Sequence, residues 1–487
     1  MSIQISRLVK DTVTYSLGAL LNRVLMFLLL PLFTRLLTPN DYGVNAVIGT
    51  LLVGLSGFFG LGTGTSLGVL YFELREESAR STVIWTSVIF LTAHGLVLCG
   101  VAAMFATPLS QMFFQSPEYS DLIRMGLVTT GLLTASEPFF AFLRMEKKAR
   151  LVVALSVVET VLGLALSVYL VAVMHRGLRG IFESALLVKG LMFVIALAVI
   201  GRRLPIRLDL KLAARLVRIG FPSVLGTGAF FVVDYLDRVM LQQMTSTGTV
   251  GVYSVGYNFG MVMLLAVGGF GSAWPPYFLS FIDRREEAQA IFGRVLKYYL
   301  AGFGSLALVF FAAARPVVML MTAPPFHGAY TVVGVVAIAY MLKGCYLILL
   351  PGVYFEKKLH LQATIEWLAA VLNIGLNLAL IPALGMEGAA YATCLSYASL
   401  PVAAYFVGRR YLVVQYEWRQ LLALVAGLTV SGFVLSWIST VASSAAQLGL
   451  SVLSLILFGV FVVAAVLGKS ERQMGLRLLA ATRRSGA

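Results

Sequence analysis

The sequence predicts an all-α polytopic membrane protein with about fourteen transmembrane helices. Hydrophobic residues make up 59% of its 487 residues and charged residues only 12%, whereas a soluble globular chain carries about 25% charged residues. The apolar residues also occur in repeated runs of about 20, the length that crosses a bilayer as a helix. This composition excludes a cytosolic enzyme and an intrinsically disordered chain.

The predicted spans are defined by windows of about 20 predominantly apolar residues. They run approximately from 12 to 37, 43 to 70, 82 to 106, 121 to 143, 151 to 174, 180 to 201, 216 to 243, 250 to 274, 292 to 313, 329 to 351, 360 to 382, 387 to 408, 418 to 440 and 446 to 468. The first is too long for a signal peptide and has no small-residue cleavage site, so we expect a retained helix. Because the count is even, both termini lie on one side.

The distribution of lysine and arginine predicts that this side is the cytoplasm. Cytoplasmic loops of membrane proteins retain an excess of these residues. With the N-terminus inside, 28 of the 37 lysines and arginines fall in or next to cytoplasmic loops, and only Arg176, Arg179 and Arg315 fall in the opposite loops. The net charge of +15 therefore reflects membrane orientation, and we expect no nucleic-acid partner.

The chain contains an internal repeat of about 208 residues. A shift of 208 superposes Gly43-Val44 on Gly251-Val252, and a shift of 210 superposes Glu146-Lys147-Lys148 on Glu356-Lys357-Lys358. Each repeat holds about six helices, so both copies enter from the same side, as in a parallel duplication about an axis along the membrane normal. The expected divisions are a six-helix lobe at 1–207, a second at 208–415, and two further helices with a basic cytoplasmic tail at 416–487.

Ionisable side chains inside the predicted spans mark a candidate transport path, because charges at bilayer depth are costly and usually face a bundle interior or a wet cavity. Candidates for binding an anionic substrate are Arg23, Asn22, Arg35, Lys189, Arg238 and Lys343. Candidates for binding a coupling cation are Asp234, Asp237, Glu159 and Glu366. The sequence leaves open a second interpretation, in which these charges form structural ion pairs, as the i, i+4 spacing of Asp234 and Arg238 allows.

Two further acids of the first lobe, Glu137 and Glu183, receive no specific role from the sequence. The three cysteines lie inside apolar runs without a CxxC pair or a histidine cluster, which argues against disulfides and a zinc site. Walker A, GxSxG and HExxH motifs are absent from the sequence. We therefore expect no enzymatic activity and no cofactor, with H⁺ or Na⁺ as the candidate coupling ion.

The run Pro31–Gly43, PLFTRLLTPNDYG, resembles the signature of bacterial oligosaccharide flippases of the Wzx type. The Glu-Lys-Lys stretch after the fourth predicted span and the glycine turn before the sixth are also similar. That family belongs to the multidrug, oligosaccharidyl-lipid and polysaccharide (MOP) exporter superfamily. The resemblance implies a MATE-like fold of two six-helix lobes that alternate between inward-open and outward-open states.

The resemblance also implies a function. Members move undecaprenyl-pyrophosphate-linked oligosaccharide across the bacterial inner membrane, and Arg23 fits their arginine in the first helix. Implied partners are the lipid-linked oligosaccharide, membrane lipid, a polysaccharide polymerase and a chain-length regulator. We expect the prenyl tail to remain in lipid, along a groove near the last two helices. The alternatives are a lipid II flippase, a drug or cation antiporter of the same superfamily, and a non-transporting scaffold of a polysaccharide synthesis complex.

Overall fold

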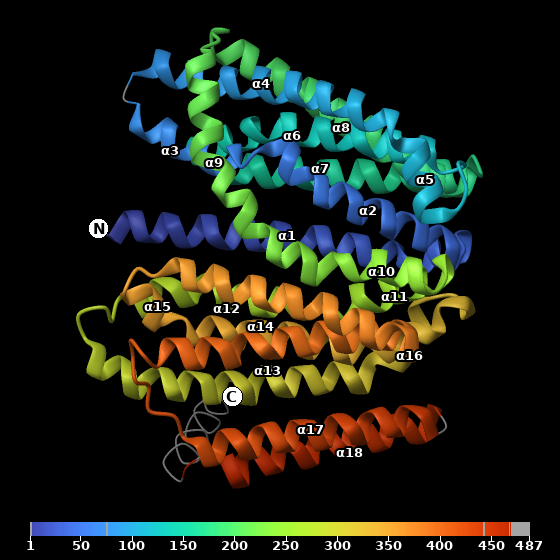
Figure 1. Ribbon diagram of the computed structural model, residues 1–487, viewed down its shortest axis with the longest axis vertical. Coiled ribbons are helices and arrows are strands. Elements are labelled where there is room, and N and C mark those ends of the chain that lie inside the picture. Colours follow the sequence, from blue (N-terminus) through green and yellow to red (C-terminus); the bar gives the residue numbers. More distant parts are fainter. Residues whose placement is uncertain (1, 75, 442–443, 467, 469–487) are drawn as a thin grey trace, which may run out of the picture. The chain divides into compact units, whose positions relative to one another are not determined.

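The computed structural model describes residues 2–74, 76–441, 444–466 and 468, and these residues form helices and short connections without a strand (Figure 1). Within them, twelve helices are long and apolar enough to cross a membrane, or thirteen when the bent pair of Thr247–Gly260 and Met263–Leu279 counts as one span. The basic tail expected at the C-terminus lies outside the described residues from 469 onward.

The fourteen predicted spans follow once one long helix is divided. Leu359–Gly408 is 50 residues long, and inside it Gly385 has a φ of 57° and a ψ of −132°, which are not helical. Glycine adopts this backbone without the steric cost of a Cβ. Because a helix rises about 1.5 Å per residue, each half has the length of one span, so the two halves correspond to the spans predicted at 360–382 and 387–408.

Two contact-defined units divide the chain. The first comprises Met1–Ser254 with Met321–Phe326, and the second comprises Val255–Leu320 with His327–Ala487. The first unit thus includes the seventh predicted span, and the lobe boundary expected after residue 207 stays a prediction about the duplication.

The helices of the first unit are α1 (Ser2–Leu36), α2 (Pro39–Gly60), α3 (Thr63–Glu73), α4 (Glu77–Met104), α5 (Ala106–Phe114), α6 (Ser120–Met145), α7 (Ala149–Val168), α8 (Gly177–Arg203), α9 (Leu210–Phe231) and α10 (Asp237–Met244), with the π-helical turns η1 (Tyr169–Val173) and η2 (Val232–Leu236). The helix α11 (Thr247–Gly260) begins in this unit and ends in the second.

The helices of the second unit are α12 (Met263–Leu279), α13 (Arg285–Met321), α14 (Tyr330–Leu349), α15 (Pro351–Phe355), α16 (Leu359–Gly408), α17 (Trp418–Val441) and α18 (Ser444–Phe461), with the π-helical turn η4 (Val462–Val466). A 3₁₀ turn, η3 (Pro324–Ala329), precedes α14.

The helix α6 is the most enclosed span of the first unit. In its most apolar stretch 67% of the residues are buried, against 11% for the span that α7 and η1 form. Small residues let its neighbours approach, as in other membrane helices: the side chain of Leu52 on α2 packs directly against Gly126. Polar side chains in the middle of α6, such as Thr130 and Ser136, are therefore buried, whereas Asp121 and Arg124 near its start are exposed.

The two Glu-Lys-Lys turns have the same backbone conformation. Lys147 and Lys357 have φ values of 58° and 55°. The lysine that follows each of them has a φ of −93° and a ψ of 50°. The amide of that lysine donates to the carbonyl five residues earlier, at 3.0 Å in both turns. The repeat seen in the charged loops is thus accompanied by matching local structure.

A reciprocal contact joins the starts of α2 and α11. A Cβ on Gly43 would collide with the carbonyl oxygen of Thr247, and a Cβ on Gly251 would collide with the carbonyl oxygen of Pro39. A shift of 208 residues converts each pair into the other. Such an exchange of equivalent residues is the pattern of a two-fold contact, and it requires glycine at both places.

Candidate functional site

A polar seam runs through α1, α7 and α8. Asn22 Nδ2 donates to Ser156 Oγ at 2.7 Å, at the place where Gly18 lets α1 pack against the side chain of Val153 on α7. One turn further along α7, Glu159 forms an ion pair with Lys189 of α8. Their side chains are 18% and 26% exposed.

The ion pair of Glu159 and Lys189 joins two residues to which the sequence gives different roles. The lysine was expected to meet an anionic substrate, and the glutamate was expected to bind a coupling cation. Because each neutralises the other, neither one presents an unpaired charge in this structure.

Arg23 lies on α1 beside Asn22 and is partly buried, whereas Arg35 lies near the end of the same helix and is exposed. Neither guanidinium makes a hydrogen bond or an ion pair to any residue that the structure describes. A guanidinium presents five N–H donors and stays charged. Of these two candidates, only Arg23 is partly buried.

The charged side chains around α10 contact one another and two neighbouring tyrosines. Arg238 Nη1 donates to Asp237 Oδ1 at 2.9 Å and to the backbone carbonyl of Asp234. Tyr253 donates its hydroxyl to Asp237 Oδ2. Asp237 is fully buried, and the arginine side chain is 8% exposed. The guanidinium also lies over the rings of Tyr235 and Tyr253.

A π-helical turn, η2, directly precedes Asp237. Arg238 pairs with the carboxylate of the adjacent Asp237, and it also donates to the backbone carbonyl of Asp234, the residue one turn earlier.

In the second unit, Lys343 and Glu366 lie where α14 faces α16. Lys343 Nζ donates to Tyr397 Oη at 3.2 Å and lies over the Tyr340 and Tyr397 rings. Glu366 is 7% exposed, and its Oε1 accepts hydrogen bonds from Tyr346 Oη at 3.0 Å and Gln362 Nε2 at 2.9 Å. The carboxylate is therefore satisfied by neutral donors.

A cavity of about 220 Å³ opens where α2 ends and α3 begins, and the carboxylate of Glu137 from α6 lines it. Leu61 and Gly62 have φ values of 47° and 68°, so the helix is broken at this point. Glu137 has no specific role among the sequence-based predictions. The signal that marks the place is the polar, glycine-rich stretch Gly60–Ser66, GLGTGTS, inside an otherwise apolar span.

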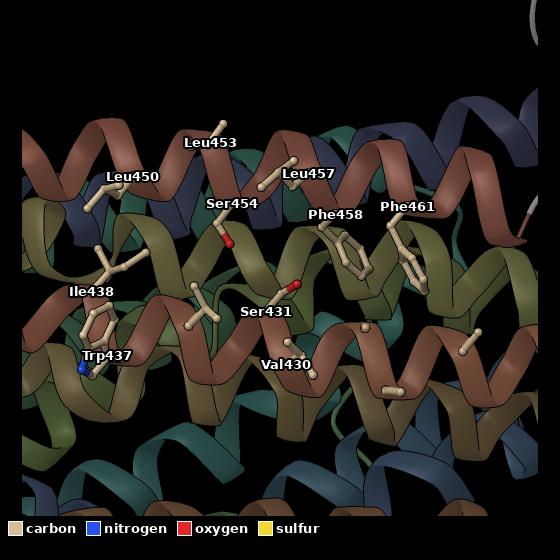
Figure 2. Close-up of a pocket in the computed structure, with 14 residues that line it drawn as sticks. Val430, Ser431, Trp437, Ile438, Leu450, Leu453, Ser454, Leu457, Phe458 and Phe461 are labelled. Carbon is tan, nitrogen blue, oxygen red and sulfur yellow. The ribbon is translucent and has the colours of Figure 1, made fainter.

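A second cavity is a long groove between α17 and α18, which lie side by side (Figures 1 and 2). It has a volume of about 700 Å³ and is almost entirely apolar. Figure 2 shows Ser454, Phe458 and Phe461 of α18 extending toward α17, with the hydroxyls of Ser431 and Ser454 in the space between the helices.

On α17 the lining residues extend from Ala423 to Ile438, a rise of about 22 Å along the helix. The hydrocarbon core of a bilayer is about 30 Å thick. The groove is therefore long enough to pass the bilayer midplane.

Comparison with known proteins places the chain in a family. Residues 8–282 match the family described as "Polysaccharide biosynthesis protein". The "Succinoglycan biosynthesis transport protein ExoT" of Rhizobium meliloti (strain 1021) is 24% identical over 65% of this chain, and the match covers 62% of that relative's length.

Two solved structures have the same fold. The "Lipid II flippase MurJ, inward closed conformation" superposes with a TM-score of 0.73 at 14% identity, over 92% of this chain and 99% of that one. A "multidrug resistance MATE family transporter of the MOP superfamily" in its inward-facing conformation superposes with a TM-score of 0.68 at 15% identity, over 80% of this chain and 94% of that one. The predicted MATE-like fold is confirmed.

Proposed function

Because the chain belongs to the polysaccharide biosynthesis protein family, we propose that it is a flippase for a prenyl-pyrophosphate-linked oligosaccharide. It moves the saccharide from the inner to the outer leaflet of a bacterial cytoplasmic membrane by alternating access. In this proposal the termini are cytoplasmic, as the distribution of basic residues predicts, and a polymerase and a chain-length regulator receive the product.

The groove between α17 and α18 carries the proposal. Flipping a lipid-linked sugar requires an apolar path for the prenyl tail as well as a polar path for the head group. The groove supplies an apolar surface that extends past the midplane, so a tail seated in it remains in contact with protein while it changes leaflet. A water-soluble drug has no tail to fill such a groove.

Arg23 is the proposed partner of the pyrophosphate. Its guanidinium has no partner among the described residues, and Arg pairs with phosphate oxygens through two parallel N–H donors. Lys189, Arg238 and Lys343 already make ion pairs, hydrogen bonds or cation–π contacts. We therefore expect Arg23 to contribute more to substrate affinity than those three cations do.

Reconstitution tests the proposal. The purified protein is incorporated into liposomes with a fluorescent undecaprenyl-pyrophosphate-linked oligosaccharide, and a membrane-impermeant quencher is added outside. Empty liposomes protect the inner-leaflet label, whereas protein-containing liposomes are expected to expose both leaflets to the quencher. Full protection of the inner leaflet at every protein density contradicts the proposal. Exposure of lipid II with no exposure of the oligosaccharide substrate favours a lipid II flippase.

Two adjacent residues of α18 provide a test variant and a control variant for the groove. Leu457 lines the groove and is 60% exposed, and the adjacent Ile456 does not line it and is 57% exposed. Leu457→Glu is expected to slow flipping at least about tenfold, which corresponds to the loss of roughly two buried CH₂ groups of the tail. Ile456→Glu is expected to retain most of the activity. Equal rates in the two variants exclude the groove as the tail path.

A further inference from the structure

The carboxylates inside the spans of the first unit differ in their partners. Glu159 forms an ion pair with Lys189. Asp237 forms an ion pair with Arg238 and accepts a hydrogen bond from the Tyr253 hydroxyl. Glu137, by contrast, makes no ion pair or hydrogen bond to any residue within the described ranges. A lone carboxylate inside a membrane span is costly unless something compensates its charge.

The other side chains around Glu137 carry oxygen as their only heteroatom. Besides the carboxylate, the polar side chains that line the cavity belong to Ser56, Thr63, Thr65, Ser223 and Thr227. None of the lining side chains is basic or an amide. The carboxylate lies directly against Gly64, where a side chain would displace it.

The hydroxyl groups that line this cavity donate their hydrogens to backbone carbonyls. Thr63 and Thr65 donate to the carbonyls of Gly60 and Gly62, at 2.7 and 2.8 Å. Ser223 of α9 donates to the Gly220 carbonyl at 2.7 Å. A hydroxyl has one hydrogen and two lone pairs, so these oxygens can offer only lone pairs to the cavity.

Two of these oxygens face each other across the cavity. Thr65 Oγ1 on α3 and Ser223 Oγ on α9 lie 3.4 Å apart. This separation is at the long end of a hydrogen bond in which either hydroxyl could donate. While both hydrogens are donated to carbonyls, lone pairs of both oxygens are free to meet one cation. Metal–oxygen distances of about 2.3–2.6 Å place adjacent ligands of one cation about 3.3–3.7 Å apart, which matches this separation.

The single negative charge of the cavity lining indicates whether a bound cation would be monovalent or divalent. One carboxylate and several neutral oxygens balance a single positive charge. Oxygen sites for divalent cations in proteins usually contain several carboxylates, and no cluster of three or more acidic, histidine or cysteine side chains occurs among the described residues. Hard oxygen ligands without sulfur or nitrogen also argue against a transition metal.

We propose that the cavity formed by the α2–α3 break, α6 and α9 is a sodium site, with Glu137 as the charged ligand and Thr65 and Ser223 as neutral ligands. Its use as the coupling ion of transport rests on the proposed function, whereas the binding itself does not. The backbones of Gly62 and Gly220 are in direct contact beside the site, so an ion held by Thr65 and Ser223 links α3 to α9 and strengthens that contact.

Sodium binding is measured on the full-length protein in detergent, with no lipid-linked substrate present. The melting temperature is followed as NaCl replaces choline chloride at constant ionic strength, because a ligand that binds the folded state raises the melting temperature saturably. Radioactive sodium, displaced by unlabelled NaCl, gives the affinity directly. Failure of this assay leaves the flippase proposal standing, and failure of flipping leaves sodium binding standing.

Three variants decide the assignment. Glu137→Gln is expected to abolish both the sodium-dependent rise in melting temperature and the bound radioactivity. Thr65→Val, which keeps the shape and removes the oxygen, is expected to weaken the affinity at least about tenfold. Glu118→Gln, a change of an exposed glutamate, is the control and is expected to bind like the wild type.

Absence of any sodium effect on the wild type overturns the proposal, as does wild-type affinity in Glu137→Gln. If Glu137→Gln does not yield folded protein, unchanged affinity in Thr65→Val overturns the proposal by itself. A response of the melting temperature to pH without a response to sodium also overturns it.

Discussion

Asp237 and Glu137 are two carboxylates of the same contact-defined unit, and their surroundings differ in every respect. Asp237 is fully buried between an arginine and a tyrosine hydroxyl. Glu137 is partly buried beside hydroxyl oxygens whose hydrogens are already donated. The first environment supplies donors and a directly bonded positive charge, whereas the hydroxyls of the second supply acceptors and the charge of Arg144 acts on Glu137 only from a distance. The charge of Asp237 is thus compensated within the structure, whereas Glu137 makes no ion pair or hydrogen bond to a described residue.

The largest effect on stability is expected from Asp237→Ala. The variant leaves Arg238 buried without its carboxylate partner, and breaking a buried pair in this way costs about 3–5 kcal/mol. The midpoint of denaturant-induced unfolding in detergent, together with the amount of membrane-inserted protein, measures the effect. Asp121→Ala is the control, because Asp121 pairs with Arg124 at the surface and is 61% exposed. Equal midpoints in the two variants would remove the structural role of Asp237.

The second expectation concerns both members of that pair. Replacing a buried ion pair by apolar residues of similar volume is often neutral, so Asp237→Leu combined with Arg238→Met is expected to recover most of the stability lost in Asp237→Ala. The same unfolding midpoint measures the recovery. A double variant as unstable as the single one would mean that the tyrosine contacts of Asp237 and Arg238, rather than their charges, hold α10 in place.

An intermediate effect is expected from Glu159→Gln. The pair of Glu159 and Lys189 is partly exposed, and polar contacts between membrane helices contribute about 0.6 kcal/mol on average. A loss near that value, and clearly smaller than that of Asp237→Ala, is expected in the unfolding midpoint. A loss as large as that of Asp237→Ala would place Glu159 among the buried structural acids.

The smallest effect on stability is expected from Glu137→Gln. With sodium replaced by choline, the variant is expected to be at least as stable as the wild type, because the change breaks no contact to a described residue and removes a costly charge. In saturating sodium the wild type is expected to become the more stable protein. If Glu137→Gln is strongly destabilised in choline, the carboxylate has a structural partner and the contrast with Asp237 disappears.

The spans were predictable from the sequence, because hydrophobic length determines which segments cross a bilayer. The span predicted at 121–143 is α6, and the gap between the spans predicted at 360–382 and 387–408 falls at Gly385, which breaks α16. Glycine supplies the conformation needed there, and that residue is visible in the sequence. Positions of helices along the chain thus follow from local composition.

The candidate site was less predictable, because pairing depends on which helices are neighbours. Glu159 and Lys189 are 30 residues apart on different helices, so no spacing rule joins them. Arg238 pairs with the adjacent Asp237, a contact that the i, i+4 spacing to Asp234 did not indicate. The cavity beside Glu137 is lined by hydroxyls of α3 and α9, which the sequence does not show to be neighbours of α6. The polar GLGTGTS stretch inside an apolar span was the one local feature that indicated this place.

The contact between Gly43 and Gly251 has a consequence for how such a chain arises. The predicted duplication implies descent from a shorter protein that pairs with a copy of itself, and in that dimer a single glycine would occupy both sides of the contact. One mutation in the ancestral gene would therefore have altered two places at once. In the fused chain the two glycines are separate genetic positions, each facing the backbone of the other repeat. Either half can now change alone, and an originally symmetric dimer interface becomes able to evolve an asymmetric one.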